Sequence, residues 1–246
     1  MPSKQKNRGQ HPEDPTLFGP KHLPALRAAT ADLSWLLSRD YPLTAALKLV
    51  GDRYRLNVRQ RKPVQRCACS DAQQAHRRTR QLLPAALAGR SLQIDGFNIL
   101  ISVEAALSGA LLFRARDGAI RDIASIHGSY RRVNQTPEAI ALIGEMLTQL
   151  SPAGVTWYLD QPVSNSGRLK TQLREIAEVR NWDWKIELVY NPDKVIAEQA
   201  GVALSGDSWV IDHAEHWFNF LRYLLAERLP EVPVLDLSPP AAATAL

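Results

Sequence analysis

The sequence predicts an α/β protein in which a mostly parallel sheet flanked by helices is preceded by a small basic module made only of helices. In residues 91–229, short apolar runs alternate with stretches of helical periodicity, which is the pattern of βαβ units. Residues 1–90 hold 17 Lys+Arg and 6 Asp+Glu, and residues 91–246 hold 13 and 19, balances of +11 and −6 that give the net charge of +5. A basic part joined to an acidic part indicates two functional units.

Composition excludes several classes of protein. The 246-residue chain is 45% hydrophobic and 22% charged, ordinary values for a globular protein with a sizeable core. It has no run of about 18 apolar residues, so no membrane span is expected. The polar N-terminus lacks the apolar segment of a secretory signal. Cys67 and Cys69 are too few for a disulfide framework, and no second pair exists to complete a zinc site. We therefore expect a cytoplasmic protein.

The N-terminal elements are predicted from apolar spacing and helix-ending residues. Residues 1–20 are rich in Pro, Gly and Lys, which indicates a disordered tail. Residues 21–90 then form the helical module. Apolar residues recur at helical spacing over 22–37, Pro42 precedes a shorter helix, and Ser70 is a plausible cap for another.

A strongly basic stretch lies within this module. Basic surface attracts polyanions, and nucleic acid is the commonest of them. An ordinary solvated surface is the alternative. The candidate nucleic-acid contacts are Arg53, Arg55, Arg59, Arg61 and Lys62.

The second part alternates strands and helices. The predicted strands are 91–95, 155–159, 184–190 and 201–205, with a hairpin over 111–123 around Asp117-Gly118 and a further short apolar run at 208–211. The predicted helices are 99–107, 136–150, 166–180, 192–199 and 214–229. Residues 230–246 are rich in Pro and Ala and show no packing pattern, so they are expected to form a tail.

Acidic residues gather where the predicted strands end. Asp95, Asp160 and Asp207 each lie at or just after the end of a strand. In open parallel sheets those ends line the crevice where ligands bind. Asp193 begins a helix near the same edge, and Asp212 follows Asp207 closely.

Packed carboxylates repel one another unless a cation neutralises them, and Mg²⁺ or Mn²⁺ suits such oxygen ligands. A metal so placed can assist attack on a phosphodiester. The alternative is that each Asp only forms a turn or caps a helix.

Local motifs add a family resemblance. Ile94-Asp95-Gly96-Phe97-Asn98-Ile99 resembles the opening motif of NYN-type PIN-like nucleases, in which the Asp binds metal and the Asn orders the loop. Asn191-Pro192-Asp193-Lys194 resembles their mid-domain acidic motif, and Ser205-Gly206-Asp207-Ser208 their final one. The resemblance implies a PIN/NYN-like fold with Asp95, Asp193 and Asp207 in its acidic motifs. Together with Asp160, which the strand-end argument adds, they are the predicted catalytic metal ligands. It departs from the family at Trp209, where those nucleases usually carry another Asp; Asp212 is a candidate substitute.

A second resemblance covers nearly the whole chain. The strings Ala46 to Tyr54, Arg59-Gln60-Arg61 and Cys69-Ser70-Asp71 resemble the domain of unknown function 434. Asp95 to Asn98, Glu104 to Gly109 and Asp160-Gln161-Pro162 resemble its companion, the domain of unknown function 5616. These family names imply no activity, so the chemistry rests on the carboxylates and on the PIN/NYN comparison.

Two further residues are weighed as site members. Glu104 on the first helix of the α/β domain either faces the crevice as a ligand of metal or water, or is a surface charge. Ser166 begins a helix whose N-terminus could receive a phosphate, or it is a simple helix cap.

The sequence therefore predicts a Mg²⁺- or Mn²⁺-dependent nuclease, a ribonuclease-like phosphodiesterase whose basic module holds nucleic acid, with RNA favoured. The alternative is a catalytically inactive RNA-binding or adaptor protein on the same fold, which Trp209 favours. A small-molecule phosphatase is a third reading, but it does not explain the basic module. Neither the oligomeric state nor the pathway follows from the sequence.

Overall fold

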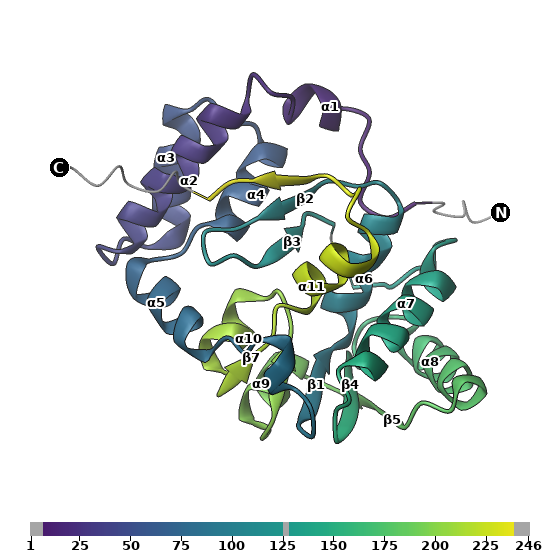
Figure 1. The fold of residues 1–246 in the computed structure, drawn as a ribbon. Coiled ribbons are helices and arrows are strands. Elements are labelled where there is room, and N and C mark those ends of the chain that lie inside the picture. The colour runs from purple at the N-terminus through teal and green to yellow at the C-terminus, as the bar shows by residue number, and fades with distance from the viewer. Residues whose placement is uncertain (1–6, 125–127, 239–246) are drawn as a thin grey trace.

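The computed structural model describes residues 7–124 and 128–238, and its centre is a five-stranded parallel sheet with strand order β5-β4-β1-β6-β7 (Figure 1). The strands of this sheet are β1 (Ser91–Asp95), β4 (Gly154–Asp160), β5 (Trp184–Val189), β6 (Val202–Leu204) and β7 (His216–Trp217). A second sheet, in the order β3-β2-β8, contains β2 (Leu112–Arg114), β3 (Ile120–Asp122) and β8 (Val234–Asp236). The α/β class with a mostly parallel sheet is confirmed.

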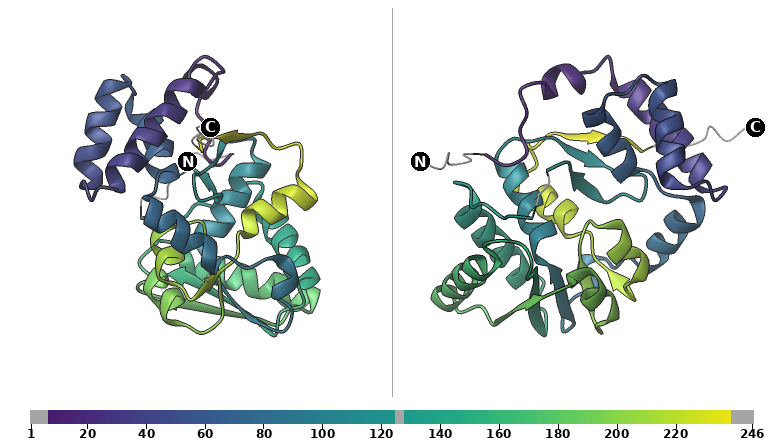
Figure 2. Two further views of the ribbon diagram at one scale, coloured as in Figure 1. Left: turned by 60° about the vertical axis from the view of Figure 1, so that its left-hand side comes forward. Right: turned by 180° about the vertical axis from the view of Figure 1, so that it is seen from behind.

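Helices surround both sheets (Figures 1 and 2). The N-terminal helices are α1 (Asp14–Leu17), α2 (Leu23–Leu37), α3 (Leu43–Arg53), α4 (Val58–Cys67) and α5 (Asp71–Arg80). The later helices are α6 (Gly96–Leu107), α7 (Thr136–Gln149), α8 (Ser166–Arg180), α9 (Pro192–Glu198), α10 (Ser208–His213) and α11 (Phe220–Arg228). None of the helices in the described part of the chain is long and apolar enough to cross a membrane.

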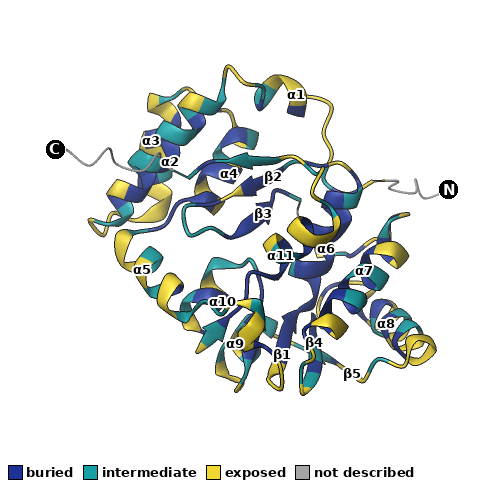
Figure 3. Cartoon of the chain, in the orientation of Figure 1, coloured by how far each residue is buried: buried dark blue, intermediate teal, exposed yellow. Residues whose placement is uncertain are grey.

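The central strand β1 is buried on both faces, as Figure 3 shows. Leu92 and Ile94 belong to the main core, which also contains residues of α6, α7, α8 and α11. Tyr158 of β4 belongs to a smaller core with Ile196 of α9 and residues of α10. Since successive side chains of a strand point to opposite faces, the two cores mark the two sides of the sheet.

The first turn after β1 requires a glycine. A Cβ on Gly96 would lie 2.6 Å from a methyl carbon of Leu159 and 2.8 Å from the carbonyl oxygen of Tyr158. The side chain of Asp95 caps the following helix by accepting a hydrogen bond from the backbone N–H of Asn98 at 3.3 Å. The close packing of β1, α6 and β4 therefore fixes where Asp95 and Asn98 lie.

The helical module packs on the second sheet. Leu26, Leu33 and Val64 share a core with Phe113 of β2 and with Leu237, which follows β8. Both α4 and α5 begin with a capping box, in which the side chain at the cap and the side chain three residues later each bond the other's backbone. The cap predicted at Ser70 is confirmed.

The structure corrects the described parts of both predicted tails, whereas residues 1–6 and 239–246 lie outside the residues that it describes. Residues 7–20 were expected to be disordered, yet Arg8 is buried and α1 lies within this stretch. The apolar residues of 234–236 form β8 and pair with β2. Because both segments are held by partners about 100 or more residues away, no local pattern identifies them.

Two elements near the C-terminal end also differ from the sequence prediction. The apolar run 208–211 belongs to the helix α10, which Asp207 caps. The helix predicted over 214–229 begins only at Phe220, because residues 216–217 form the edge strand β7 beside β6. The strand β7 forms through its pairing with β6, whereas α10 begins at the local cap made by Asp207.

Candidate functional site at the carboxyl ends of the parallel strands

The candidate site lies where the strand order of the large sheet reverses. The chain passes from β1 to β4 and β5 on one side and then crosses to β6 on the other. Such a reversal leaves a ligand crevice beyond the carboxyl ends of the strands. Asp95 is the last residue of β1, Asp160 is the last residue of β4, and Asp207 shortly follows β6. The strand ends predicted to carry acids are therefore brought to one edge of the sheet.

Asp95 is the most deeply placed of these acids. It is 7% exposed, and its Oδ2 accepts a hydrogen bond of 2.7 Å from the hydroxyl of Ser205. Burial raises the pKa of Asp95 to about 7; the Ser205 hydrogen bond opposes that rise, and the charges of Asp193 and Asp207 add to it. At neutral pH the carboxyl group of Asp95 is therefore close to half protonated.

The remaining acids surround this position. Asp95 pairs with Tyr158 across the two strands, so Asp160, two residues further along β4, points to the same face as Asp95. The helix α9 packs against β1 and β4, and Asp193 lies in its first turn. Burial raises the pKa of Asp193, and the charges of Asp207 and Asp160 raise it further. Four carboxylates from separate parts of the chain are close enough to influence one another.

Asp160 and Asp207 differ in the hydrogen bonds that their carboxylates accept. Burial raises the pKa of Asp160, and one of its oxygens is buried without a hydrogen-bond partner in the described part of the chain. Asp207 uses Oδ1 to cap α10, accepting from the backbone N–H of Trp209 at 2.8 Å and of Val210 at 3.4 Å. Asp95 and Asp207 therefore do cap helices, which was the alternative considered for each Asp. Both also belong to the acidic group, which consists of Asp95, Asp160, Asp193 and Asp207.

A hydrogen-bonded frame holds the loop that carries Asp207. The Asn98 side-chain oxygen accepts from the backbone N–H of Gly206 at 2.7 Å, and the hydroxyl of Ser205 accepts from the N–H of Asp207 at 2.9 Å. On the other side, Arg121 donates from Nε to the carbonyl oxygen of Gly206 at 2.7 Å. The loop that Asn98 holds in place is therefore the loop after β6.

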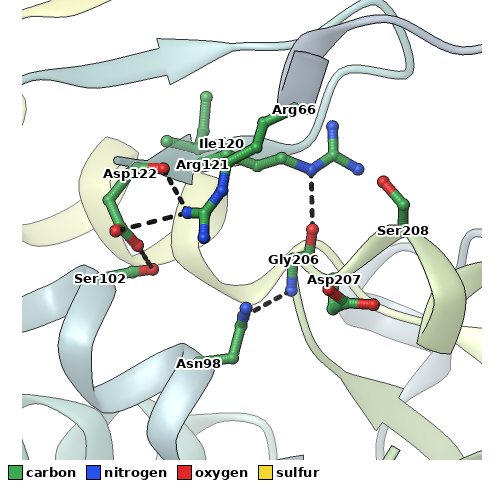
Figure 4. A pocket seen from close by; sticks show the side chains of 9 residues that line it. All are labelled: Arg66, Asn98, Ser102, Ile120, Arg121, Asp122, Gly206, Asp207 and Ser208. Atoms are coloured by element: carbon green, nitrogen blue, oxygen red, sulfur yellow. Dashed lines mark hydrogen bonds and ion pairs between the residues drawn. The ribbon is translucent and has the colours of Figure 1, made fainter. Parts of the chain in front are cut away.

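A small hollow of about 50 Å³ opens beside this loop (Figure 4). It is lined by Arg66 of α4, Asn98 and Ser102 of α6, Ile120, Arg121 and Asp122 of β3, and Gly206, Asp207 and Ser208. The hollow therefore joins the helical module to the acidic edge of the α/β domain.

The geometry does not provide a ready-made metal cage. Within residues 7–124 and 128–238, no three His, Cys, Asp or Glu side chains are grouped closely enough to hold an ion by themselves. The donor chemistry nevertheless suits a hard cation, because the acidic group offers carboxylate oxygens and one buried oxygen of Asp160 has no partner. Mg²⁺ is commonly bound by one or two carboxylates together with waters and phosphate oxygens.

Asp212 is not part of this acidic group. Its carboxylate accepts from Arg77 through two hydrogen bonds, Nε at 2.6 Å and Nη2 at 2.7 Å, and also accepts from Gln73. Arg77 pairs at the same time with Asp117, whose carboxylate contacts Arg121 as well. The expectation that Asp212 replaces the acid missing at Trp209 is therefore corrected, because Asp212 is committed to an ion pair on the α5 side of α10.

Glu104 and Ser166 also lie elsewhere than expected. Glu104 is fully buried, and its carboxylate accepts from Arg8 at 2.8 Å and from the hydroxyls of Tyr130 and Thr136. It is neither a crevice ligand nor a surface charge. Ser166 is buried at the start of α8, where its hydroxyl donates to the carbonyl oxygen of Gln161 at 3.3 Å, whereas the cap position belongs to Asn165.

The basic candidates of the helical module fall into two groups. Arg59 pairs with Asp14 through two hydrogen bonds, and Arg61 pairs with Asp52, so these two arginines stabilise the module. Arg53, Arg55 and Lys62 are exposed. Arg53 lies 3.4 Å from Asp32, but 71% of its side chain is accessible. Only the exposed group remains available for a polyanion.

Several residues at the site were missed by sequence reasoning. Ser205 bonds Asp95, and Arg66 and Asp122 line the hollow. Ser205 stands beside Gly206-Asp207 in the motif, so its position could have been noticed. Arg66 and Asp122 carry no local signal, because they meet the site only through the packing of α4 on the second sheet.

Comparison with known proteins gives families without a stated activity. A family model described as a domain of unknown function (DUF5616) matches residues 84–223, more than half of the chain. One described as a protein of unknown function (DUF434) matches residues 25–80. The uncharacterized protein MJ0935 of Methanocaldococcus jannaschii is 30% identical over 187 residues, which cover 76% of this chain and 89% of that protein. No solved structure matches significantly.

Proposed function

The chain belongs to the DUF5616 family, with a DUF434 region before it, and we propose that it is a divalent-metal-dependent nuclease, a ribonuclease-like phosphodiesterase on a PIN/NYN-like fold. The observation that most supports this proposal is the acidic group formed by Asp95, Asp160, Asp193 and Asp207. These acids share one edge of the sheet at the reversal of strand order. Besides burial, the charges of Asp193 and Asp207 raise the pKa of Asp95, and the charges of Asp207 and Asp160 raise the pKa of Asp193. A partly buried group of like charges is costly for the fold, and acids with perturbed pKa values are typical of functional sites.

The positions of the motifs support the PIN/NYN comparison. Asp95 to Asn98 spans the junction of β1 and α6, Asp193 lies in the first turn of α9, and Asp207 begins α10 after β6. Each acid is thus mounted at the end of a regular element, as a catalytic group requires. The nuclease assignment itself remains our proposal.

Mg²⁺ or Mn²⁺ would be held by Asp95, Asp160, Asp193 and Asp207, and it would supply an activated water and neutralise charge on the phosphodiester. Ser205 and the N–H of Asn98 hold the carboxylate of Asp95 in place. Asn98 and Arg121 fix the loop of Asp207 from opposite sides. Because burial raises the pKa of Asp95 to about 7, its carboxyl group would have to lose its proton to hold the cation.

The test is hydrolysis of single-stranded RNA with Mn²⁺. We expect the wild-type protein to cleave RNA and Asp95→Asn to be at least about a hundredfold slower, on the order of the loss seen when one group that stabilises a transition state is removed. Asp183→Asn is the matched control, since Asp183 is exposed and precedes β5 at the opposite edge of the sheet. If wild type and Asp95→Asn are equally inert on RNA and DNA, the nuclease proposal is wrong.

A non-catalytic RNA-binding or adaptor protein is the second candidate. It is favoured by Trp209, which is 44% exposed where related nucleases carry an acid, and by the commitment of Asp212 to Arg77. Such a protein would bind nucleic acid equally well in Mn²⁺ and in EDTA, with strong salt dependence. Binding without hydrolysis in both conditions would favour this candidate over the nuclease.

A further inference from the structure

The hollow beside Asp207 contains an acceptor that no group in the described part of the chain satisfies. Asp122 is 5% exposed, and its Oδ2 accepts a hydrogen bond of 2.5 Å from the hydroxyl of Ser102. Its Oδ1 is buried and has no hydrogen-bond partner there. A buried carboxylate oxygen without a donor costs free energy, so a donor supplied by a ligand would bind it favourably.

Arg66 stands beside that acceptor without satisfying it. Its Nη1 donates to the backbone carbonyl oxygen of Asp122 at 2.6 Å and therefore stays 3.6 Å from Oδ1, beyond hydrogen-bond length. The rest of the guanidinium makes no other hydrogen bond in the described part of the chain, and the side chain is 45% exposed. Figure 4 shows Arg66, Asp122 and Ser102 grouped on one side of the hollow, with Asp207 and Ser208 across from them.

The size and position of the hollow limit what it can hold. About 50 Å³ accommodates a hydroxyl group or a few waters, and it is too small for a nucleobase. It adjoins Asp207, so an occupant would lie next to the acidic group. The occupant that fits has a hydroxyl to donate to Asp122 and a neighbouring anionic group to accept from Arg66.

We propose that the hollow formed by Arg66, Ser102 and Asp122 is a sugar–phosphate subsite that reads the ribose 2′-hydroxyl of an RNA strand. The 2′-hydroxyl donates to Oδ1 of Asp122, and the adjacent phosphate accepts from Arg66. A 2′-hydroxyl is the group by which a protein distinguishes RNA from DNA at one position. This inference rests on the proposed function, deepens it by naming the sugar, and gives the DUF434 region a direct part in the site through Arg66.

Binding of labelled single-stranded oligonucleotides, measured in EDTA so that no cleavage occurs, tests the subsite. Matched RNA and DNA of one sequence are compared by fluorescence anisotropy. We expect wild type to bind RNA on the order of tenfold more tightly than DNA, the effect of one hydrogen bond to a charged group. Asp122→Asn is expected to bring this ratio close to one, while Arg66→Gln weakens RNA and DNA together.

Two control variants separate the subsite from general charge effects. Asp183→Asn makes the same change as Asp122→Asn at an exposed site, and Lys48→Gln removes one positive charge from exposed α3. Both should keep the RNA-to-DNA ratio of wild type. The subsite is wrong if wild type binds neither nucleic acid, if it binds RNA and DNA equally, or if Asp122→Asn keeps the full preference.

The outcome is independent of the nuclease test. An RNA preference that depends on Asp122, in a protein that hydrolyses nothing, would support the subsite and reject the nuclease. Hydrolysis that depends on Asp95, with RNA and DNA bound equally, would support the nuclease and reject the subsite.

Discussion

Asp117 and Asp95 are both aspartates with buried side chains in the same α/β domain, yet their surroundings have opposite character. The side chain of Asp117 is 1% exposed and ion-paired with Arg77 and Arg121. Burial alone would raise its pKa, but the two arginines lower it to about 2. Asp95 has a serine hydroxyl and a backbone N–H as partners, with other carboxylates nearby, and burial raises its pKa to about 7. The arginines therefore favour the charged form of Asp117 in the folded protein, whereas the surroundings of Asp95 disfavour its charged form.

The largest effect that can test this contrast is removal of Arg77. We expect Arg77→Met to lower the free energy of unfolding by about 3–5 kcal/mol, because Asp117 and Asp212 then lose their shared partner. Urea denaturation measures the change. Arg78→Met is the control at the neighbouring exposed position and should cost no more than about 0.5 kcal/mol. Equal losses in the two variants would show that the paired network is not structural.

A second prediction concerns pH and Asp95. Its folded pKa of about 7 exceeds the unfolded value near 3.8, so the fold favours the protonated form. The stability contributed by Asp95 is full below pH ~4 and is lost as the pH rises to ~7, by up to about 4 kcal/mol.

Asp95→Asn should therefore be more stable than wild type at pH 8. Its free energy of unfolding should also lack the decrease between pH ~4 and pH ~7 that Asp95 causes. Comparing unfolding free energies of the two proteins at pH 5 and pH 8 isolates the contribution. Asp117→Asn should instead be less stable than wild type. Its free energy of unfolding at pH 8 should fall by about 3 kcal/mol, because Arg77 and Arg121 are left poorly paired. A destabilised Asp95→Asn at pH 8 would contradict the contrast.

Much of the fold followed from local pattern. The strand ending at Asp95, the hairpin at Asp117-Gly118 and the cap at Ser70 are each encoded within a few neighbouring residues. The elements that were missed depend on distant partners. β8 forms only because β2 offers an open edge, and Arg8 is buried only because Glu104 lies inside the domain.

The site divides in the same way. Acids at strand ends could be predicted, since parallel strands bring their carboxyl ends to one edge. The partner of each acid could not be predicted, because only packing places Arg77 beside Asp212. For the same reason Arg59 appeared to be a nucleic-acid contact, whereas it is bound to Asp14.

A third prediction is cation-dependent stability. Saturating Mn²⁺, at about 100 times its dissociation constant, should stabilise the wild-type protein by about 2.7 kcal/mol and raise the melting temperature by roughly 5–10 °C at pH 8. The rise should be smaller at pH 6, because Asp95 must lose its proton to bind a cation. Differential scanning fluorimetry measures it. An equal rise in Asp95→Asn would place the cation elsewhere.

The smallest effect is expected at the surface of the helical module. Lys62→Gln should weaken single-stranded RNA binding by roughly two- to fivefold and lower the salt dependence of affinity by about one unit of slope, as for one phosphate contact. Arg61→Gln should instead act mainly on stability, since Arg61 pairs with Asp52. Affinity titrations at several salt concentrations distinguish the two. An unchanged slope in Lys62→Gln would exclude this surface from the interface.

Titration calorimetry with Mn²⁺ at pH 7, in buffers of different ionisation enthalpy, tests the acidic edge most directly. Because the pKa of Asp95 is about 7, binding should be saturable and release roughly half a proton in wild type and in Asp183→Asn. Asp95→Asn should show weaker binding and no proton release from this position. If wild type gives no binding heat, or if Asp95→Asn binds Mn²⁺ with the same affinity and proton release, the carboxylates at the strand ends do not form a cation site.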